Sequence, residues 1–397
     1  MATINTNYNK VASAYVFSEI GKRVKAFIEK NPGVEIMRLG IGNTTEALTP
    51  TVVEGLMEGV KKLADTKTYT GYGDEQGDSR LRKELAAFYE NRGISFEPEE
   101  IFISDGAKPD SANISSIFGS DNIVAVTDPV YPVYSDSNVI AGKKVVYMEC
   151  KEENGFAPTL PKEKADLIFI CSPNNPIGTV LTKKQLKAFV DYAKKEKAVI
   201  IFDAAYAEYI SDKNLPRSIY EIPGAKSCAV EINSFSKLAG FTGVRLGWTV
   251  VPMDLVVEGE EKGKVNSLWN RRQTTMFNGA SNIVQEGGLA VLSKKGQKEC
   301  KKMVGYYMNN AKIIKRGISK MGLKAFGGEN APYIWLKVPG NMSSWEFFDK
   351  LLKEAQVVGT PGTAFGQGGE GYFRLSAFGH KENIEEAVKS IQKNLKL

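Results

Sequence analysis

Lys237 lies in a segment whose residue types could support covalent catalysis. The segment reads Asn233-Ser-Phe-Ser-Lys-Leu-Ala-Gly240, and Arg245 follows eight residues after the lysine. A lysine amine can form a Schiff base with a carbonyl compound, and the planar fork of an arginine can hold an anion. Most lysines are only surface charges, so this interpretation depends on the residues that accompany Lys237.

Two more polar side chains follow apolar runs that have the composition of buried strands. Asp203 comes directly after Ile200-Ile-Phe, and Asn175 comes shortly after the run 167–171. The carboxyl ends of parallel strands build the ligand sites of open α/β sheets. A carboxylate buried there needs a cationic partner, because burying it alone costs several kcal/mol. Asn175 could also belong to an ordinary Pro/Gly turn.

Pyridoxal 5′-phosphate is a common cofactor that requires all of these groups. A lysine forms a Schiff base with its aldehyde, a carboxylate keeps its ring nitrogen protonated so that the ring accepts electrons, and an anion clamp holds its phosphate. The sequence therefore predicts a pyridoxal phosphate enzyme that uses Lys237, Asp203 and Arg245 in these roles.

The elements that must position these residues follow an α/β pattern. Short apolar runs that are typical of buried strands occupy 122–126, 144–148, 167–171, 198–202, 229–232 and 247–251. Helical spacing of apolar residues is clear in 14–30 and 183–195. Continuous apolar strands separated by helices indicate a mainly parallel central sheet covered by helices.

The rest of the chain indicates a second, smaller unit. A helix-rich region at 286–321 precedes two further strand-like runs, 332–338 and 371–376. At about 150 residues per domain, 397 residues suggest two to three domains. We predict a large cofactor-binding domain at 47–290 and a small α+β domain built from 1–46 and 291–397.

Composition and charge exclude several classes of protein. The 52 basic and 46 acidic residues leave a net charge of +6, scattered along the chain, which argues against a nucleic-acid surface. No apolar run approaches the roughly 20 residues of a membrane span. One histidine, His380, and four cysteines without a Cys-x-x-Cys pair argue against a metal site. We expect a cytoplasmic protein that binds neither membranes nor nucleic acid.

Several motifs together resemble those of a known family. Besides the Lys237 segment, they are Thr70-Gly-Tyr-Gly-Asp-Glu-Gln-Gly77, Ser104-Asp-Gly-Ala-Lys108, Asn175-Pro-Ile-Gly178, Phe277-Asn-Gly-Ala-Ser281 and Tyr372-Phe-Arg-Leu-Ser-Ala-Phe-Gly-His380. With these motifs, and with Lys237 34 positions after Asp203, the chain resembles fold-type I pyridoxal phosphate-dependent aminotransferases, specifically the LL-diaminopimelate aminotransferase family. The resemblance implies the fold of type I transferases over nearly the whole chain.

This resemblance implies a role for each residue around the cofactor, with Lys237, Asp203 and Tyr206 as the catalytic residues. Lys237 would carry the Schiff base and move the proton between the substrate Cα and C4′ of the cofactor. Asp203 would pair with the ring nitrogen, and Asn175 and Tyr206 would bond the ring 3-oxygen. Tyr131 would stack on the ring face. The phosphate would be held by the backbone of Ala107 and Lys108, by Ser234, Ser236 and Arg245, and by Tyr72 of a partner subunit.

The resemblance also implies a homodimer with shared active sites and a substrate. Arg374 would bind the α-carboxylate of the substrate in a bidentate pair. Glu75 from the partner would select a second, distal amino group. The full expected substrate-binding set is Tyr15, Gly42, Glu75, Lys108, Tyr131, Asn175, Asn278 and Arg374, of which Tyr15, Glu75 and Asn278 come from the partner. Asn43 stands where many relatives carry an acidic residue, a departure that bears on substrate handling.

The implied reaction interconverts LL-2,6-diaminopimelate and tetrahydrodipicolinate, with 2-oxoglutarate and glutamate as the second pair, in lysine biosynthesis. The nearest alternative is a related aminotransferase for aspartate, alanine or aromatic amino acids. A lyase or synthase of the same fold is a further alternative. A ligand-sensing module joined to a DNA-binding region is less favoured, because the family motifs already start near Tyr15.

Overall fold

The computed structural model describes residues 1–11, 16–40 and 42–397, so Tyr15 lies outside the described residues. The helices are α1 (Val16–Lys30), α2 (Pro50–Ala64), α3 (Ser79–Glu90), α4 (Ala107–Asn113), α5 (Pro132–Ile140), α6 (Lys183–Glu196), α7 (Phe235–Leu238), α8 (Lys264–Met276), α9 (Asn282–Leu292), α10 (Lys294–Lys320), α11 (Ser344–Ala355) and α12 (Lys381–Asn394). The strands are β1 (Met37–Arg38), β2 (Ile101–Ser104), β3 (Val124–Asp128), β4 (Val145–Glu149), β5 (Leu167–Cys171), β6 (Val199–Asp203), β7 (Ala229–Ser234), β8 (Gly247–Val250), β9 (Ala325–Gly327), β10 (Tyr333–Lys337), β11 (Val357–Val358), β12 (Thr360–Pro361) and β13 (Tyr372–Ser376).

A seven-stranded sheet in the order β2-β8-β7-β6-β5-β3-β4 forms the centre of the larger part of the molecule. The neighbours from β4 to β7 pair in parallel, and only β8 runs antiparallel to both of its neighbours. The predicted mainly parallel sheet is therefore confirmed. Each of the six predicted runs forms a strand of this sheet, shifted by at most two residues at either end. The four-residue strand β2 was not predicted, because so short a run carries little periodicity.

Both faces of this sheet are buried. Alternate residues of β5 and β6 enter two different hydrophobic clusters: Ile168 and Ile200 lie in one, Phe169 and Ile201 in the other. Leu186 of α6 packs in the first cluster, and helices α5, α8 and α10 contribute to the second. This burial explains the continuous apolar composition of the strands, since a half-exposed strand would alternate apolar and polar residues.

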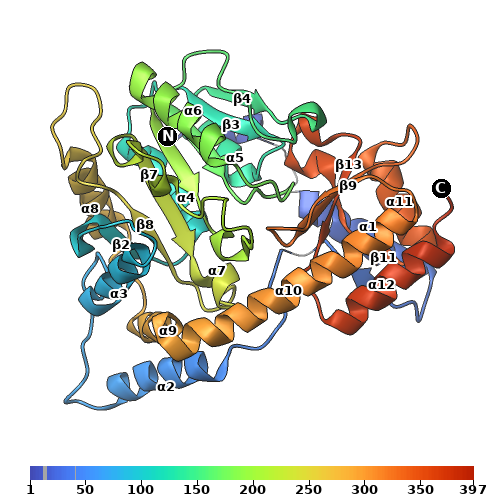
Figure 1. The fold of residues 1–397 in the computed structure, drawn as a ribbon, viewed down its shortest axis with the longest axis horizontal. Coiled ribbons are helices and arrows are strands. Elements are labelled where there is room, and N and C mark those ends of the chain that lie inside the picture. Colours follow the sequence, from blue (N-terminus) through green and yellow to red (C-terminus); the bar gives the residue numbers. More distant parts are fainter. Residues whose placement is uncertain (12–15, 41) are drawn as a thin grey trace.

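A four-stranded antiparallel sheet, β12-β13-β10-β9, and the short parallel pair β1-β11 lie in a second part of the molecule. Their core joins both ends of the chain, because Ile20 and Val24 of α1 pack in the same cluster as residues of α11 and α12. Figure 1 shows α10 running from α9 beside the large sheet to this second part, and its residues Cys300 and Ile314 belong to the two different cores. The division at 46/47 and 290/291 stays a prediction, and the second of these boundaries falls inside α9, which ends at Leu292.

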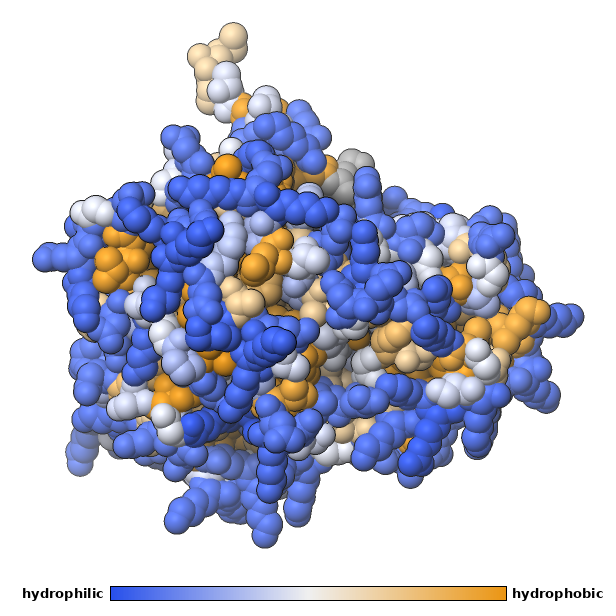
Figure 2. All heavy atoms as spheres, turned by 45° about the horizontal axis from the view of Figure 1, so that its top comes forward, coloured by the Kyte–Doolittle hydropathy of each residue, from blue (hydrophilic) through white to orange (hydrophobic). Residues whose placement is uncertain are grey.

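Figure 2 shows hydrophilic side chains over most of one face of the molecule, with small hydrophobic areas between them. Within the described ranges, every helix is either too short or too polar to cross a lipid bilayer.

Candidate active site

A cavity of about 320 Å³ opens where β5, β6 and β7 end, close to the second part of the molecule. It gathers segments from across the chain, from residue 42 to residue 374. The predicted site residues that line it are Gly42, Ala107, Lys108, Tyr131, Asn175, Asp203, Tyr206, Ser234, Ser236, Lys237, Arg245 and Arg374. The carboxyl ends of parallel strands thus build the site, as expected from the fold class.

Asp203 is a buried carboxylate at the end of β6, with 8% of its surface exposed. Tyr134 donates a hydrogen bond to its Oδ2 at 2.6 Å, and the backbone N–H of Ala205 donates to its Oδ1 at 2.9 Å. Burial raises the pKa of Asp203, and these two hydrogen bonds oppose that rise. Asp203 lines the cavity, and among the described residues it belongs to no ion pair. A cationic atom of a ligand would therefore stabilise its ionised form.

Lys237 projects into the cavity from α7, the short helix that directly follows β7. Its amine donates to the carbonyl oxygen of Gly42 and lies 5.0 Å from the ring centre of Phe378. Burial first, and then the positive charges of Arg374 and Arg245, lower the pKa of Lys237 to about 7. A large share of the amine is therefore neutral near neutral pH, as a nucleophile or general base must be. Of the two guanidinium groups, Arg374 lowers the pKa of Lys237 more than Arg245 does.

Arg245 and the turn before α4 form a cradle for an anion. The guanidinium lies so close to Gly106 that a Cβ at that position would stand 2.5 Å from Nη2 of Arg245. Gly106 also has φ +129°, which residues with side chains rarely adopt. Arg245 donates from Nη1 to Ser236 Oγ at 3.3 Å. Ala107 begins α4, and the first N–H groups of a helix have no acceptor within the helix.

Arg374 is almost completely buried, with 2% of its surface exposed, on strand β13. Its Nη1 donates to Asn175 Oδ1 at 2.7 Å and its Nη2 to the carbonyl oxygen of Gly40 at 3.0 Å. Its Nε is buried without a partner, and among the described residues no carboxylate pairs with this guanidinium. A buried cation of this kind lacks its counter-charge. The carboxylate of an amino acid would supply it.

Several residues of the site were not predicted from the sequence. The hydroxyls of Tyr206 and Tyr333 lie 2.8 Å apart, and both tyrosines are buried beside Arg374. Tyr134 follows Tyr131 by three residues, and residues at this spacing are neighbours on the surface of a helix. The predicted role of Tyr131 could therefore have indicated Tyr134 as well. Nothing local marks Tyr333, which reaches the site through the pairing of β10 with β13. The lining residues that were not predicted are Tyr134, Cys171, Ala205, Thr242 and Tyr333. Asn43, which the sequence connected with substrate handling, also lines the cavity.

Three of the predicted residues that the structure describes are not brought to this cavity. Tyr72, Glu75 and Asn278 are absent from the described residues that line it, and Tyr15 lies outside the described residues. Tyr72 is 90% exposed. Within one chain the structure therefore brings together Arg374 and the predicted cofactor-binding residues other than Tyr72. Tyr72, Glu75 and Asn278 lie elsewhere on the chain.

The groups in the cavity fit pyridoxal phosphate. The cavity offers a carboxylate without a cation for the ring nitrogen, an amine of low pKa for the aldehyde, and the Gly106 and Arg245 cradle for the phosphate. A comparison with known families agrees: the family described as "Aminotransferase class I and II" matches residues 34–391. The chain belongs to the class I and II aminotransferases. These enzymes use pyridoxal phosphate and act on amino acids and 2-oxo acids.

Solved structures of aminotransferases match nearly the whole chain. L,L-diaminopimelate aminotransferase from Chlamydomonas reinhardtii is 46% identical, over 99% of this chain and 98% of its own, with a TM-score of 0.93. Aspartate aminotransferase from Thermotoga maritima is 26% identical over 98% and 99%, with a TM-score of 0.85. Aromatic aminotransferase from Pyrococcus horikoshii is 26% identical over 94% and 98%, with a TM-score of 0.82. The resemblance that the sequence motifs indicated is confirmed.

The aminotransferase site divides the chemistry among its residues. When bound, pyridoxal phosphate supplies an aldehyde that takes up the amino group and a ring that accepts electrons from the substrate Cα. We infer that Lys237 would move the proton at Cα, because its low pKa would let the amine both accept and return it near neutral pH. In the same way, Asp203 would hold the proton on the ring nitrogen, and Arg374 would orient the substrate through its carboxylate.

Proposed function

We propose that this aminotransferase interconverts LL-2,6-diaminopimelate and tetrahydrodipicolinate, with 2-oxoglutarate and glutamate as the second substrate pair. The observation that carries the proposal is the 46% identity, over 99% of the chain, to an L,L-diaminopimelate aminotransferase. The aspartate and aromatic aminotransferases named above share 26%. The enzyme then serves lysine and diaminopimelate biosynthesis.

The substrate also accounts for Glu75. Diaminopimelate carries a second amino group far from the reacting carbon, and a carboxylate at that point binds the ammonium while it disfavours apolar side chains. Glu75 does not line the cavity of its own chain among the described residues. It therefore acts in the site of a second subunit, together with Tyr72 and Asn278.

Exposed apolar side chains support the homodimer. On helix α2, Val53, Met57 and Val60 are 39%, 55% and 53% exposed and repeat at steps of four and three residues, so they share one face. Tyr72 at 90% and Met276 at 72% add to the exposed apolar surface. Such surface on a folded chain is typical of contact with another protein. Light scattering is expected to give twice the mass of one chain, and a monomer at working concentration would contradict the dimer.

A donor screen tests the substrate. With 2-oxoglutarate as the acceptor, LL-diaminopimelate is expected to give a much higher kcat/KM than meso-diaminopimelate, lysine, aspartate or alanine. A preference for aspartate, alanine or an aromatic amino acid would favour the alternative aminotransferases instead. Release of ammonia without an acceptor would indicate a lyase.

The variant Glu75→Gln tests recognition of the distal amino group. It removes the negative charge and keeps the shape, so kcat/KM for diaminopimelate is expected to fall by about 10- to 100-fold, as for loss of a charged hydrogen bond of 1.5 to 3 kcal/mol. The kcat/KM for glutamate, which has no distal ammonium, changes less. Asp74→Asn is the matched control, since Asp74 is the exposed neighbouring carboxylate. Equal losses in both variants, or unchanged diaminopimelate activity in Glu75→Gln, would remove Glu75 from this role.

A further inference from the structure

The two segments that carry Tyr72, Glu75 and Asn278 lie against each other within one subunit, although about 200 residues separate them in the sequence. They are residues 70–77 and 277–281. A Cβ at Gly279 would stand 3.1 Å from the carbonyl oxygen of Asp74 and 3.5 Å from Cα of Glu75. Gly279 has φ +92° and Asn278 φ +66°, so this second segment turns through left-handed conformations. The backbones of the two segments are thus in direct contact.

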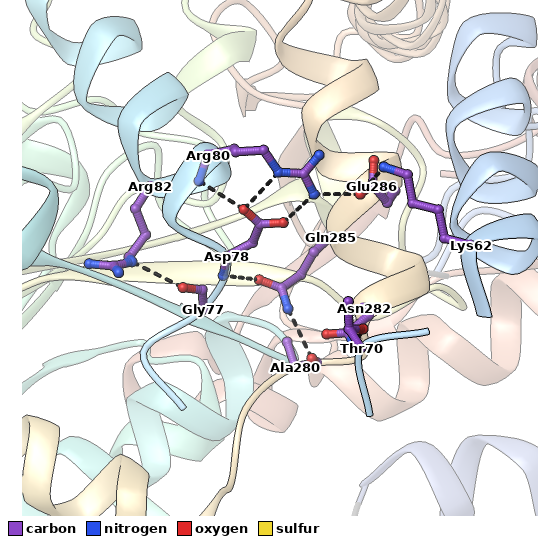
Figure 3. A network of polar contacts seen from close by, with 10 residues as sticks. All are labelled: Lys62, Thr70, Gly77, Asp78, Arg80, Arg82, Ala280, Asn282, Gln285 and Glu286. Atoms are coloured by element: carbon purple, nitrogen blue, oxygen red, sulfur yellow. Dashed lines mark hydrogen bonds and ion pairs between the residues drawn. The ribbon is translucent and has the colours of Figure 1, made fainter. Parts of the chain in front are cut away.

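Gln285 joins the two segments through a single side-chain amide. It lies on α9 with 2% of its surface exposed. Its Oε1 accepts from the backbone N–H of Asp78 at 2.7 Å, and its Nε2 donates to the carbonyl oxygen of Ala280 at 3.0 Å. Figure 3 shows the amide of Gln285 between Asp78 and Ala280. One buried side chain therefore holds the residue that follows the first segment and a residue inside the second.

Asn282 holds the other end of the first segment. It is the first residue of α9, and its Nδ2 donates to Thr70 Oγ1 at 2.8 Å and to the carbonyl oxygen of Gly71 at 2.9 Å. With Gln285 at Asp78, helix α9 grips residues 70–77 at both ends. Because Asn282 and Gln285 belong to the same helix, their hydrogen bonds fix the position of the segment between Thr70 and Asp78.

Ion pairs surround this contact but add less to it. Glu286 pairs with Lys62 at 2.7 Å and with Arg80, and Arg80 also pairs with Asp78, which caps α3. Arg80 is 54% exposed and Lys62 33%. Exposed pairs are worth little each, because water screens them. The buried amide of Gln285 and the donor of Asn282 are the specific part of the network in Figure 3.

We propose that Gln285 and Asn282 are positioning residues that act on the active site of the partner subunit. They hold residues 70–77 and 277–281 as one unit, so that Tyr72, Glu75 and Asn278 reach the partner's cofactor and substrate in a fixed arrangement. This inference rests on the proposed homodimer with shared sites. Neither residue lines the cavity of its own chain among the described residues.

The variants Gln285→Leu and Asn282→Ala test this role. Gln285→Leu removes both hydrogen bonds, and Asn282→Ala, at a partly exposed position, removes the donor to Thr70 and Gly71 with less risk to folding. Both are expected to weaken pyridoxal phosphate binding, through Tyr72, and to lower kcat/KM for diaminopimelate by about tenfold or more, since a small misplacement of a positioning group is costly. Fluorescence titration of the cofactor and steady-state kinetics measure the two effects.

Mixed dimers show in which site each residue acts. Each variant is co-produced with Lys237→Ala under a second affinity tag, and the dimers that carry both tags are isolated. In such a dimer one active site contains the intact Lys237 of the Gln285 or Asn282 variant subunit. The segments 70–77 and 277–281 of that site come from the Lys237→Ala subunit, in which Gln285 and Asn282 are unchanged. We expect the kcat/KM of that site to return to the value of one wild-type site. Asn175→Ala is the control, because Asn175 lines the cavity of its own chain and its loss is not restored by the partner.

The outcomes separate this inference from the proposed function. Wild-type kcat/KM in Asn282→Ala, together with wild-type kinetics in any folded Gln285→Leu, would overturn the positioning role. A loss that the mixed dimer fails to restore would show damage inside the same subunit and overturn it as well. If the wild-type enzyme prefers another donor, only the substrate proposal fails, and the mixed dimers are assayed with that donor. A monomeric wild-type enzyme overturns both the homodimer and this inference.

Discussion

Replacement of Arg374 tests the central electrostatic feature of the site. The Arg374 side chain is buried, at 2% exposure, and has five N–H donors. Among the described residues these donors bind only Asn175 Oδ1, the Gly40 carbonyl and, at 3.4 Å, Thr360 Oγ1. At least two donors, including the buried Nε, remain for a substrate carboxylate. Two charged hydrogen bonds at about 1.5 to 3 kcal/mol each give about 3 to 6 kcal/mol, or a loss of about 10²- to 10⁴-fold in kcat/KM for Arg374→Leu.

The same replacement has a second effect that serves as an internal check. Arg374 lowers the pKa of Lys237, so its removal is expected to raise that pKa above about 7. Arg374→Lys keeps the charge and loses the planar fork, so it is expected to lower kcat/KM while leaving the pKa of Lys237 nearly unchanged. The assay is kcat/KM against pH for two amino donors, with titration of the free enzyme. Equal kcat/KM for wild type and Arg374→Leu would refute the assignment of Arg374 to the carboxylate.

The further predictions concern three residues of the cofactor pocket. Burial lowers the pKa of Lys237 from 10.5 to about 7, so between these pH values the unfolded chain binds a proton that the folded chain lacks. The free energy of unfolding of the cofactor-free enzyme is therefore expected to rise with pH across this window. Denaturant titrations of Lys237→Met are expected to lack that rise. That variant is also expected to show no visible absorbance and no turnover, and activity in it would refute the role of the amine. Asp203→Asn is expected to slow exchange of the substrate Cα proton, followed by NMR in D₂O, by orders of magnitude while the cofactor still binds; wild-type exchange would count against the electron-sink role. Gly106→Ala places a methyl group 2.5 Å from Arg245 Nη2 and is expected to weaken cofactor binding by about 1 to 3 kcal/mol in a titration, whereas Gly243→Ala, with open space around its Cβ, is expected to leave it unchanged.

The strands of the large sheet could be predicted because their signal is local. Residues 167–171 and 198–202 are apolar at every position, which requires a sheet covered on both faces, and the structure buries each of them. The short strands β1, β11 and β12 have two residues each and no periodicity to read. β1 and β11 exist because they pair with each other from opposite ends of the chain, and β12 exists because it pairs with the nearby strand β13.

The site was predictable to the extent that its residues follow strand ends. Lys237, Asp203 and Asn175 each come shortly after an apolar run, and the cavity contains all three. The bond from Tyr134 to Asp203 and the contact between Tyr206 and Tyr333 were not predicted, since each joins residues more than 60 positions apart. Sequence spacing carries no information about such pairs.

The order of residue types along the chain was enough to determine the fold class and the cofactor and to predict the reacting amine, because burial periodicity and the chemistry of single side chains are local properties. Only the folded chain decided that Arg374 lies buried without a carboxylate beside Asn175, that its charge helps to lower the pKa of Lys237, and that Gln285 ties together two segments far apart in sequence. These features depend on desolvation and on distances between remote residues, which arise when tertiary packing brings the segments together and excludes water.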